Sequence, residues 1–512
     1  MPCLLKNIKK DKLLKIQITI ICPQLITLYE DNLGSGIPYM PVIAAYLAAV
    51  LKDKYDITVI DAFGENPFNA RIENKYIIQG ITYDELLQKI PQNSKYCILY
   101  ASTVMANYVL HKTIKLIKEK CPGMQIILIE NSQGVIGCSL KFIYKDFFDS
   151  GADYIILGEC EENVPVLINI LEREDKSLIS SISGIIFKNA DNTYTVNSDV
   201  KIIDDLDSLP FPAWELFPIH NYWKLGYSHG PMQANYLAVM TSRGCPFNCS
   251  FCVVPSMNRN KWRPRSPENV VKELEFLCNR FNAFEFHLED LNPTSNEKRI
   301  IDICRLILDK NLKISWKLAS GSKIETINID TLDLMKQAGC SYVSFSPESG
   351  SNKVLKLMNK PFKHEYALKM TKKMNKLGII TQACFVLGFP GENSKDRILT
   401  QKYIVQLTKA GVDEIALFIM TPIPGTKTFD RFKGYSDYSE LTFAPTWRQD
   451  YAQLYKFRNI TYLKFLLFKL IFHPFKVIRQ FINLLRKNFE TKSEMNIYRL
   501  MKIKKIIKQS AN

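Results

Sequence analysis

Short apolar runs alternate with amphipathic stretches along the first part of the chain. The runs are rich in β-branched residues and predict strands, and the stretches between them repeat apolar positions with the period of a helix. Strands are expected at residues 15–22, 57–61, 96–101, 125–129 and 154–158, and helices at 41–54, 106–120 and 160–172. Such an alternation is typical of an α/β domain with a parallel sheet covered by helices. We therefore predict a doubly wound, flavodoxin-like domain over residues 1–200.

A second alternation begins after a segment without periodicity. Residues 201–236 contain Pro, Gly and aromatic residues and predict a linker. Further strands are expected at residues 237–242, 284–288, 314–319, 342–346, 382–388 and 414–420, with helices between them, for example 267–280 and 297–310. Six strand–helix units predict a partial (β/α)6 barrel over residues 237–430, with its site at the carboxyl ends of the strands. A helical, basic region is expected over residues 431–512, broken at Pro474.

Composition narrows the class of protein. With 512 residues and 46% apolar residues, the chain can fill more than one core, so a disordered protein is excluded. The 13 cysteines lack the dense spacing of a secreted disulfide scaffold and indicate reduced thiols in the cytoplasm. The N-terminal sequence does not have the pattern of a signal peptide, and no run of 18 uncharged apolar residues predicts a membrane-spanning helix.

The positive charge is concentrated at the end of the chain. The net charge is +16, and residues 451–512 contain 14 Lys or Arg but only two acids, Glu490 and Glu494. Large apolar residues and cations together suit a helix that lies on anionic lipid, which would give peripheral membrane contact. Alternatively, these helices close the open side of the barrel and leave their lysines in water.

Three cysteines follow the first strand of the second alternation. Cys245, Cys249 and Cys252 form a C-x3-C-x2-C pattern on one expected loop, where three thiolates can bind three irons of a [4Fe-4S] cluster. The fourth iron would stay open for S-adenosylmethionine, whose reductive cleavage gives a 5′-deoxyadenosyl radical.

A zinc site is the alternative for these cysteines. Zinc prefers four protein ligands, and the nearest histidines, His229 and His287, lack ligand spacing. Phe251, directly before the third cysteine, would lie against the adenine or pack the loop.

The motifs resemble those of the radical S-adenosylmethionine superfamily. The resemblance is carried by the cysteine loop and by three segments: Leu-Asp-Ser-Leu-Pro-Phe-Pro at 206–212, Ser-Pro-Glu-Ser-Gly at 346–350 and Gly-Phe-Pro-Gly-Glu at 388–392. Over residues 15–430 the chain is similar to the subgroup with an N-terminal cobalamin (B12)-binding-like domain. That subgroup includes the anaerobic magnesium-protoporphyrin ester cyclases and the hopanoid-type methyltransferases.

The resemblance implies a binding site for S-adenosylmethionine at the strand ends. It assigns Glu289 and Asp290 to the amino group, Ser346 and Glu348 to the ribose or methionine moiety, and Val386 and Leu387 to the adenine. Each of these residues also has a purely structural interpretation, because carboxylates at strand ends often cap helices and Val and Leu often belong to the core.

The resemblance leaves the binding of cobalamin open. In the family the loop after the first strand can carry a histidine that ligates cobalt, but here residues 23–40 contain none, so a His-ligated cobalamin is excluded. Ser102 and Thr103 match the expected Ser or Thr after the third strand. The Gly-Gly expected after the fourth strand is replaced by Glu-Asn-Ser at 130–132, whose larger side chains oppose close approach of the cofactor. Gly-Glu-Cys-Glu at 158–161 matches the family pattern.

The leading hypothesis is an enzyme that acts on an unactivated carbon of a small hydrophobic metabolite. It would use cobalamin-dependent methyl transfer if cobalamin is bound, and cyclisation or oxidation if it is not. An electron donor such as a flavodoxin or ferredoxin would be needed. A non-catalytic iron–sulfur or zinc-binding interaction protein is one alternative. A methylthiotransferase-like enzyme that modifies transfer RNA is another, but those enzymes end in a small β-rich RNA-binding domain, so the helical tail disfavours nucleic acid as a partner.

Overall fold

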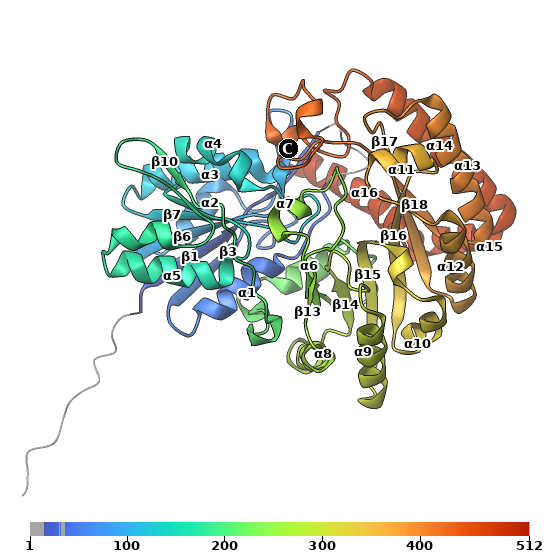
Figure 1. Ribbon diagram of the computed structural model, residues 1–512, viewed down its shortest axis with the longest axis horizontal. Helices are drawn as coiled ribbons and strands as arrows, with labels where there is room; N and C mark the ends of the chain where they lie inside the picture. Colours follow the sequence, from blue (N-terminus) through green and yellow to red (C-terminus); the bar gives the residue numbers. More distant parts are fainter. Residues whose placement is uncertain (1–14, 30, 32–35, 511–512) are drawn as a thin grey trace, which may run out of the picture.

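Two large sheets form the framework of the protein (Figure 1). The computed structural model describes residues 15–510, except residues 30 and 32–35. One sheet is built from strands between residues 17 and 196 and the other from strands between residues 236 and 419. The described cysteines form no disulfide. The prediction that a signal peptide is absent concerns residues 1–14 in part, and these lie outside the described residues.

The N-terminal sheet has the strand order of a flavodoxin-like domain. Its parallel strands are β1 (Gln17–Cys22), β3 (Asp56–Asp61), β6 (Ser94–Ala101), β7 (Gln125–Glu130) and β8 (Tyr154–Ile156). They lie in the order β3-β1-β6-β7-β8, so the second strand is followed by the first, third, fourth and fifth. This order is typical of doubly wound flavodoxin-like folds and confirms the predicted fold class.

Helices cover both faces of this sheet. They are α1 (Val42–Leu51), α2 (Tyr83–Lys89), α3 (Asn107–Lys120), α4 (Tyr144–Asp149) and α5 (Cys160–Glu172). Ile20 in β1 packs in the core that includes α1 and α5, whereas its neighbour Ile21 packs in the core on the side of α3. Because both faces of each strand are buried, the strands read as nearly continuous apolar runs.

Five short strands of the N-terminal part were not predicted. β9 (Ile185–Lys188) and β10 (Tyr194–Val196) extend the main sheet beyond β8 in antiparallel fashion. β2 (Leu25–Leu28), β4 (Ala70–Glu73) and β5 (Tyr76–Gln79) form a separate antiparallel sheet. With three or four residues each, they are too short for a periodicity of two to stand out in the sequence.

The second sheet is the predicted open barrel. Its strands are β11 (Tyr236–Val239), β14 (Glu285–Leu288), β15 (Ser315–Ser322), β16 (Cys340–Glu348), β17 (Ile380–Leu387) and β18 (Glu414–Ile419), parallel and in sequential order. The helices of this part are α7 (Val254–Asn258), α8 (Pro267–Phe281), α9 (Glu297–Asp309), α10 (Leu332–Gln337), α11 (Asn352–Leu357), α12 (His364–Leu377) and α13 (Ser394–Ala410). Parallel strands that do not close on themselves leave one side of the barrel open beside β18.

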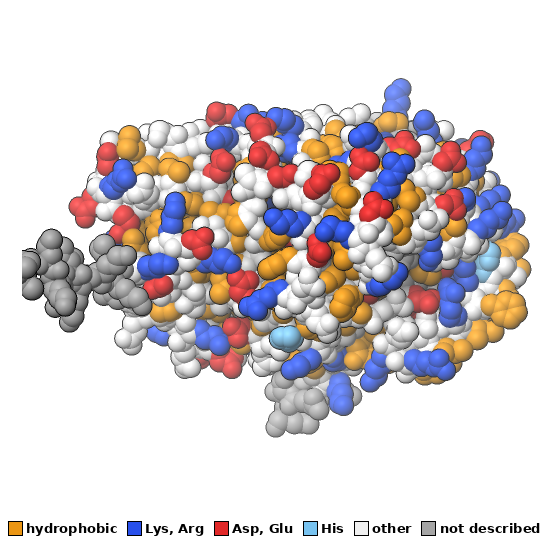
Figure 2. Space-filling model, turned by 90° about the horizontal axis from the view of Figure 1, so that it is seen from below, with side chains coloured by type: hydrophobic (Ala, Val, Ile, Leu, Met, Phe, Trp, Pro, Cys, Tyr) orange, Lys and Arg blue, Asp and Glu red, His pale blue; other side chains and the backbone are white. Residues whose placement is uncertain are grey.

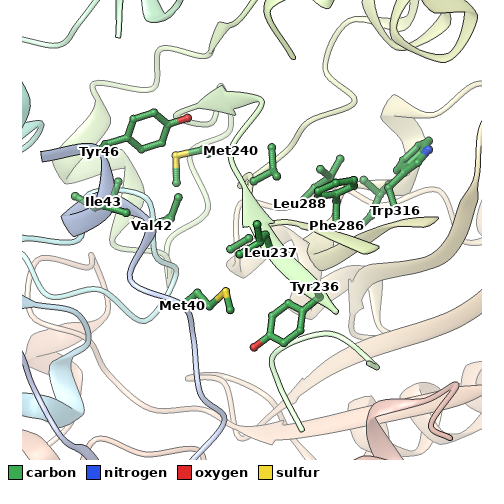
Figure 3. Packing of buried hydrophobic residues seen from close by; sticks show 14 of the residues in the cluster. Met40, Val42, Ile43, Tyr46, Tyr236, Leu237, Met240, Phe286, Leu288 and Trp316 are labelled. Atoms are coloured by element: carbon green, nitrogen blue, oxygen red, sulfur yellow. The ribbon is translucent and has the colours of Figure 1, made fainter. Parts of the chain in front are cut away.

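One hydrophobic core joins the two sheets (Figure 3). Val42 and Ile43 of α1 lie beside Met240, which follows the first barrel strand, and Leu237 of that strand belongs to the same core. The segment predicted as a linker takes part in this core, because Trp214 is buried there and α6 (Ile219–Leu225) packs against it. The linker is therefore an ordered layer between the two sheets.

Two buried ion pairs fasten the cysteine loop to the N-terminal domain. The loop is closed by a short antiparallel ladder between β12 (Ser242–Arg243) and β13 (Arg263–Pro264). Arg243 lies 2.6 Å from Glu161, and Arg263 lies 2.5 Å from Glu159. Both carboxylates belong to the start of α5, and all four side chains are nearly inaccessible to solvent. We call these two pairs the clasp.

The tail consists of three helices, α14 (Tyr451–Phe472), α15 (Pro474–Arg486) and α16 (Lys492–Ser510). The break at Pro474 is confirmed. The tail covers the open side of the barrel, because the hydroxyl of Tyr462 accepts a hydrogen bond from the backbone of Leu417 in β18. The expectation that its lysines stay in water is wrong for Lys469, which is buried and donates to the backbone carbonyl of Asp413.

Breaking the clasp should destabilise the protein. The Glu161→Gln substitution removes the nearer of the two carboxylates beside the buried Arg243 guanidinium, and the other, Glu159 at 3.9 Å, already pairs with Arg263. We therefore expect a loss of about 3 kcal/mol in the free energy of unfolding. Chemical denaturation measures it. The control is Glu162→Gln in the same helix, where the pair with Lys201 is exposed and the change should stay below about 1 kcal/mol. Equal losses in the two variants would contradict a structural role for the clasp.

Candidate functional site

A single cavity connects the carboxyl ends of the barrel strands with those of the N-terminal sheet. Its volume is about 870 Å³. Its lining includes Cys22 and Ser102 from the N-terminal sheet and Ser346 and Met420 from the barrel. Active sites of barrels and of doubly wound sheets are found at such strand ends. Both domains therefore contribute to one site.

The cysteine loop enters this cavity directly after the first barrel strand. Gly244 has φ +79°, and a Cβ atom there would lie 2.0 Å from the carbonyl oxygen of Lys261, so only glycine fits. The backbone N–H of Gly244 donates to Oε1 of Gln133, at 2.8 Å. The turn that follows brings the predicted ligands Cys245, Cys249 and Cys252 to the cavity wall.

The electrostatics of the three thiols suit an anionic metal cluster. Burial raises the pKa of all three, that of Cys252 to about 12, so the free thiols are protonated at neutral pH. The ammonium groups of Lys360 and Lys323 oppose this effect at Cys245 and Cys249. Metal ligation would replace the protons, and the two cations would balance the negative charge of an iron–sulfur cluster.

The donor set fits a [4Fe-4S] cluster by its chemistry. Three sulfur donors on one loop line a shared cavity, and cations stand beside them. In the part of the chain that the structure describes, there is no group of three or more His, Cys, Asp or Glu side chains that could hold a single metal ion.

Strand β16 ends in two of the predicted binding residues. Ser346 and Glu348 both line the cavity. Glu348 has φ +62°, an uncommon conformation for a residue with a side chain, and its carboxylate lies 2.5 Å from the ammonium of Lys360. Burial lowers the pKa of Lys360, but Glu348 and the nearby thiols outweigh burial and raise it, so the lysine stays charged. The Lys360 side chain thus lies between the Glu348 carboxylate and the thiols of the cysteine loop.

Other predicted residues divide between the cavity and the core. Val386 and Phe251 line the cavity, and the ring of Phe251 meets that of Phe389 edge-on at 6.4 Å. Leu387, the next residue after Val386, is fully buried and lies outside the described lining. Asp290 is also absent from the lining, because its carboxylate accepts hydrogen bonds from Thr241 and Ser242. It fixes the backbone just before the cysteine loop.

Glu289 lines the cavity with a partner that the sequence did not indicate. Its carboxylate lies 2.7 Å from Nδ1 of His229, and the ring of Tyr39 lies tilted against this imidazole, with the ring centroids 4.3 Å apart. Burial lowers the pKa of His229, although the charge of Glu289 raises it, so the imidazole is neutral at neutral pH. A neutral imidazole that donates from Nδ1 to a carboxylate has its free lone pair on Nε2. A pair of this kind can take up a proton at Nε2, and we call it the dyad.

The tail also reaches the cavity. Lys492, the first residue of α16, is buried and lines it, and its ammonium donates to the backbone carbonyl of Ala319 at 2.8 Å. Burial lowers the pKa of this lysine. A polar group from the end of the chain thus enters the barrel.

The segment after β7 supports the cysteine loop. Gln133 lines the cavity, accepts a hydrogen bond from Gly244 and donates from Nε2 to Asn258 at 2.9 Å. Ser102 and Thr103, which follow β6, also line the cavity. Glu130 is buried and accepts from the backbone N–H of Gly158 at 2.7 Å, and burial raises its pKa to about 7. Residues at the position of the family's Gly-Gly are therefore engaged in contacts within the protein.

Four functional candidates were missed in the sequence: Lys323, Lys360, His229 and Lys492. Each is a single residue outside any motif, and each comes from a different loop or helix start. Spacing along the chain therefore gave no signal for them. Only their position at the cavity identifies them.

Comparison with known proteins identifies the second domain. Residues 239–404 match the family model of the Radical SAM superfamily. An uncharacterised methyltransferase of Pyrococcus horikoshii is 26% identical over 438 residues, which cover 85% of this chain and 86% of that protein. Cytidylyl-2-hydroxyethylphosphonate methyltransferase of Streptomyces wedmorensis is 24% identical, with coverage of 80% and 81%. The anaerobic magnesium-protoporphyrin IX monomethyl ester cyclase of Rubrivivax gelatinosus is 26% identical, with coverage of 69% and 60%.

Solved structures share the arrangement of both domains. The radical S-adenosylmethionine methyltransferase TsrM from Kitasatospora setae superposes with a TM-score of 0.60 at 13% identity, over 81% of this chain and 75% of TsrM. The cobalamin-dependent S-adenosylmethionine radical enzyme OxsB gives a TM-score of 0.57 at 19% identity, over 87% of this chain and 56% of OxsB. Residues 239–404, whose three cysteines line one cavity, thus form a radical SAM domain.

Proposed function

We propose that the protein is a radical S-adenosylmethionine enzyme that acts on an unactivated carbon of a small hydrophobic molecule. The observation that carries the proposal is that the thiols of Cys245, Cys249 and Cys252 line the same cavity as the barrel strand ends. A [4Fe-4S] cluster held there would supply the electron that cleaves S-adenosylmethionine to the 5′-deoxyadenosyl radical.

The residues around the cysteine loop would bind S-adenosylmethionine. Ser346 and Glu348 line the cavity close to Lys360, whose ammonium can pair with a carboxylate. Val386 and Phe251 offer apolar and aromatic surface for an adenine ring. Glu289 remains a candidate for the amino group, although His229 already occupies part of its carboxylate.

The rest of the cavity suits an apolar substrate. Side chains without polar groups line much of it, among them Ile26, Met105, Ile136, Phe418 and Phe443. These residues come from both domains and from the segment after β18. A cavity with such walls favours a substrate that loses little hydration when it enters.

Whether cobalamin binds decides which kind of reaction we propose. TsrM has been solved with cobalamin and a [4Fe-4S] cluster bound, and OxsB is a cobalamin-dependent enzyme. Here Ser102 and Thr103 line the cavity, whereas Glu130, Asn131 and Ser132 stand where a glycine pair would admit the cofactor. We propose methyl transfer if cobalamin binds without a histidine ligand, and cyclisation or oxidation if it does not.

The partners follow from this chemistry. We propose a small-molecule substrate, a flavodoxin or ferredoxin as electron donor, and peripheral contact of the tail with a membrane. Cations near the cysteine loop, such as Lys323, would suit the acidic surface of such a donor. No described helix is long and apolar enough to cross a membrane.

The Cys245→Ala variant tests the proposed reaction. Anaerobic protein, reconstituted with iron and sulfide, should form 5′-deoxyadenosine after addition of dithionite and S-adenosylmethionine. The variant should lose this product, because two thiolates cannot hold the cluster firmly. The control is Cys121→Ala, which removes a thiol outside the cavity and should leave the yield unchanged. Cobalamin in the purified protein, together with S-adenosylhomocysteine among the products, would indicate methyl transfer.

A bound cluster that yields no 5′-deoxyadenosine would contradict the proposal that the protein is a radical S-adenosylmethionine enzyme. That outcome would favour a non-catalytic iron–sulfur protein. Four-coordinate zinc in place of iron would favour a zinc-binding interaction protein.

The Gly244→Ala substitution should prevent cluster assembly. Its Cβ would lie 2.0 Å from a backbone oxygen, and its φ is unfavourable for alanine, so the loop must move. We expect iron content after reconstitution to fall by about half or more. The matched control is Gly123→Ala, where an added Cβ meets nothing within 4 Å. Equal iron content in both variants would show that the loop tolerates the strain.

The dyad can be tested by titration. Replacing Glu289 with Gln removes the negative charge that raises the pKa of His229, so the imidazole should lose its proton at a lower pH. We expect the pKa of His229 to fall by about 1 unit or more, measured by NMR on protein with labelled histidine. An unchanged pKa would mean that the two side chains are not coupled in solution.

A further inference from the structure

Helices α14 and α15 expose their apolar faces. More than half of the side chain surface is accessible at most of these positions, and Phe475 reaches 83%. The exposed residues are Leu463, Leu466, Leu467, Leu470, Ile471 and Phe472 in α14, and Phe475, Ile478, Phe481, Ile482 and Leu485 in α15. We call this set the apolar face. Figure 2 shows hydrophobic side chains gathered at the right-hand end of the molecule, the end at which α14 and α15 lie in Figure 1.

Two cations of α14 point into the protein. Lys469, only 1% exposed, donates to the backbone of Asp413 and to Gln480. Arg458 is also buried. In a water-exposed helix the apolar stripe faces the core and the lysines face solvent. Here large apolar side chains occupy much of the exposed face as well, so water is not the medium that suits this surface.

Charge complements the apolar face. Between residues 451 and 489 the chain contains no Asp or Glu, and Lys464, Arg486 and Lys487 are exposed there. Arg479 pairs with Glu490, the nearest acid that follows. Apolar side chains bordered by cations fit the interface of a bilayer that contains anionic lipid. A helix of this kind lies in the interface, and no described helix could span the bilayer.

The cavity opens within this surface. Its lining reaches Leu463 and Leu466 in α14 and Ile497 in α16, and all three are about half exposed or more. The same cavity holds the cysteine loop at its other end. The cavity therefore leads from the apolar face to the candidate active site, past apolar side chains and a few polar ones such as Asn459 and Asn496.

We propose that α14 and α15 lie on an anionic membrane, and that the opening between α14 and α16 admits a membrane-dissolved lipid as substrate. The membrane contact is argued from the apolar face and the cations beside it, and it does not depend on the proposed function. The identification of the entering lipid as substrate rests on the proposed function. The substrate would then move from the bilayer into the cavity without passing through water.

Vesicle binding tests the membrane contact. The full-length protein should co-sediment with vesicles of phosphatidylcholine and phosphatidylglycerol, and about tenfold more weakly with phosphatidylcholine alone. Phe475→Glu should abolish binding, and because this side chain is exposed the protein should still fold. The control is Leu178→Glu, which changes an exposed leucine of the N-terminal domain and should bind like the unaltered protein. Equal binding of both variants, or a dimer in solution that Phe475→Glu dissociates, would overturn the proposal.

Photolabelling tests the passage. A lipid with a diazirine in its acyl chain should label α14, α16 and the cavity strand β17. Leu466→Trp should reduce labelling of β17 about tenfold, because a larger side chain narrows the opening, while vesicle binding persists. Leu467→Trp is the matched control, since Leu467 is equally exposed, at 56% against 53%, but does not line the cavity. Identical labelling of β17 in both variants would overturn the passage.

The two proposals fail in different ways. If 5′-deoxyadenosine forms but vesicles are not bound, the lipid proposal fails and the radical enzyme stands. If β17 is labelled but no 5′-deoxyadenosine forms, the passage stands and the proposed reaction fails.

Discussion

The clasp is the interaction on which the site depends. Arg243 and Arg263 stand at the two ends of the cysteine loop, and each pairs with a buried glutamate at the start of α5. A buried charge without its partner is costly, so the loop and the N-terminal domain cannot separate without a large loss of stability. Gln133 adds neutral hydrogen bonds from the same domain. The conformation of the loop that holds the three cysteines is therefore set by a domain to which it does not belong.

This constraint explains why the cavity needs both domains. The barrel supplies the cysteine loop, the strand ends at Ser346 and Val386, and Glu289, whose partner His229 comes from the segment before the barrel. The N-terminal sheet closes the opposite wall, and the tail contributes Lys492. A radical must be kept from water and from unwanted partners, and enclosure between rigid layers serves that purpose. The apolar face adds a route by which an insoluble molecule can reach this enclosed space.

Much of the fold could be predicted from the sequence, because strands buried on both faces and helices with one apolar face leave strong periodic patterns. The cysteine spacing predicted the candidate cluster loop, and Gly-Glu-Cys-Glu at 158–161 was noted without its role in the clasp. What the sequence did not give depends on contacts between distant segments. The pairing of His229 with Glu289, that of Lys360 with Glu348 and the burial of Lys469 in α14 have no signature in local spacing. For Asp290 the motif position predicts a contact with the ligand, but in the structure its carboxylate accepts hydrogen bonds from the backbone of Thr241 and the hydroxyl of Ser242. It therefore holds the loop in place.

The central claim is that the loop from Cys245 to Cys252 holds a cluster with one iron open toward the cavity. Electron paramagnetic resonance of the reduced, reconstituted protein tests it most directly, with spectra recorded before and after S-adenosylmethionine is added. The account predicts a [4Fe-4S] signal whose g values change on addition, because the molecule coordinates the open iron. A [4Fe-4S] signal that stays the same would contradict it, since a cluster with four protein ligands has no place for S-adenosylmethionine.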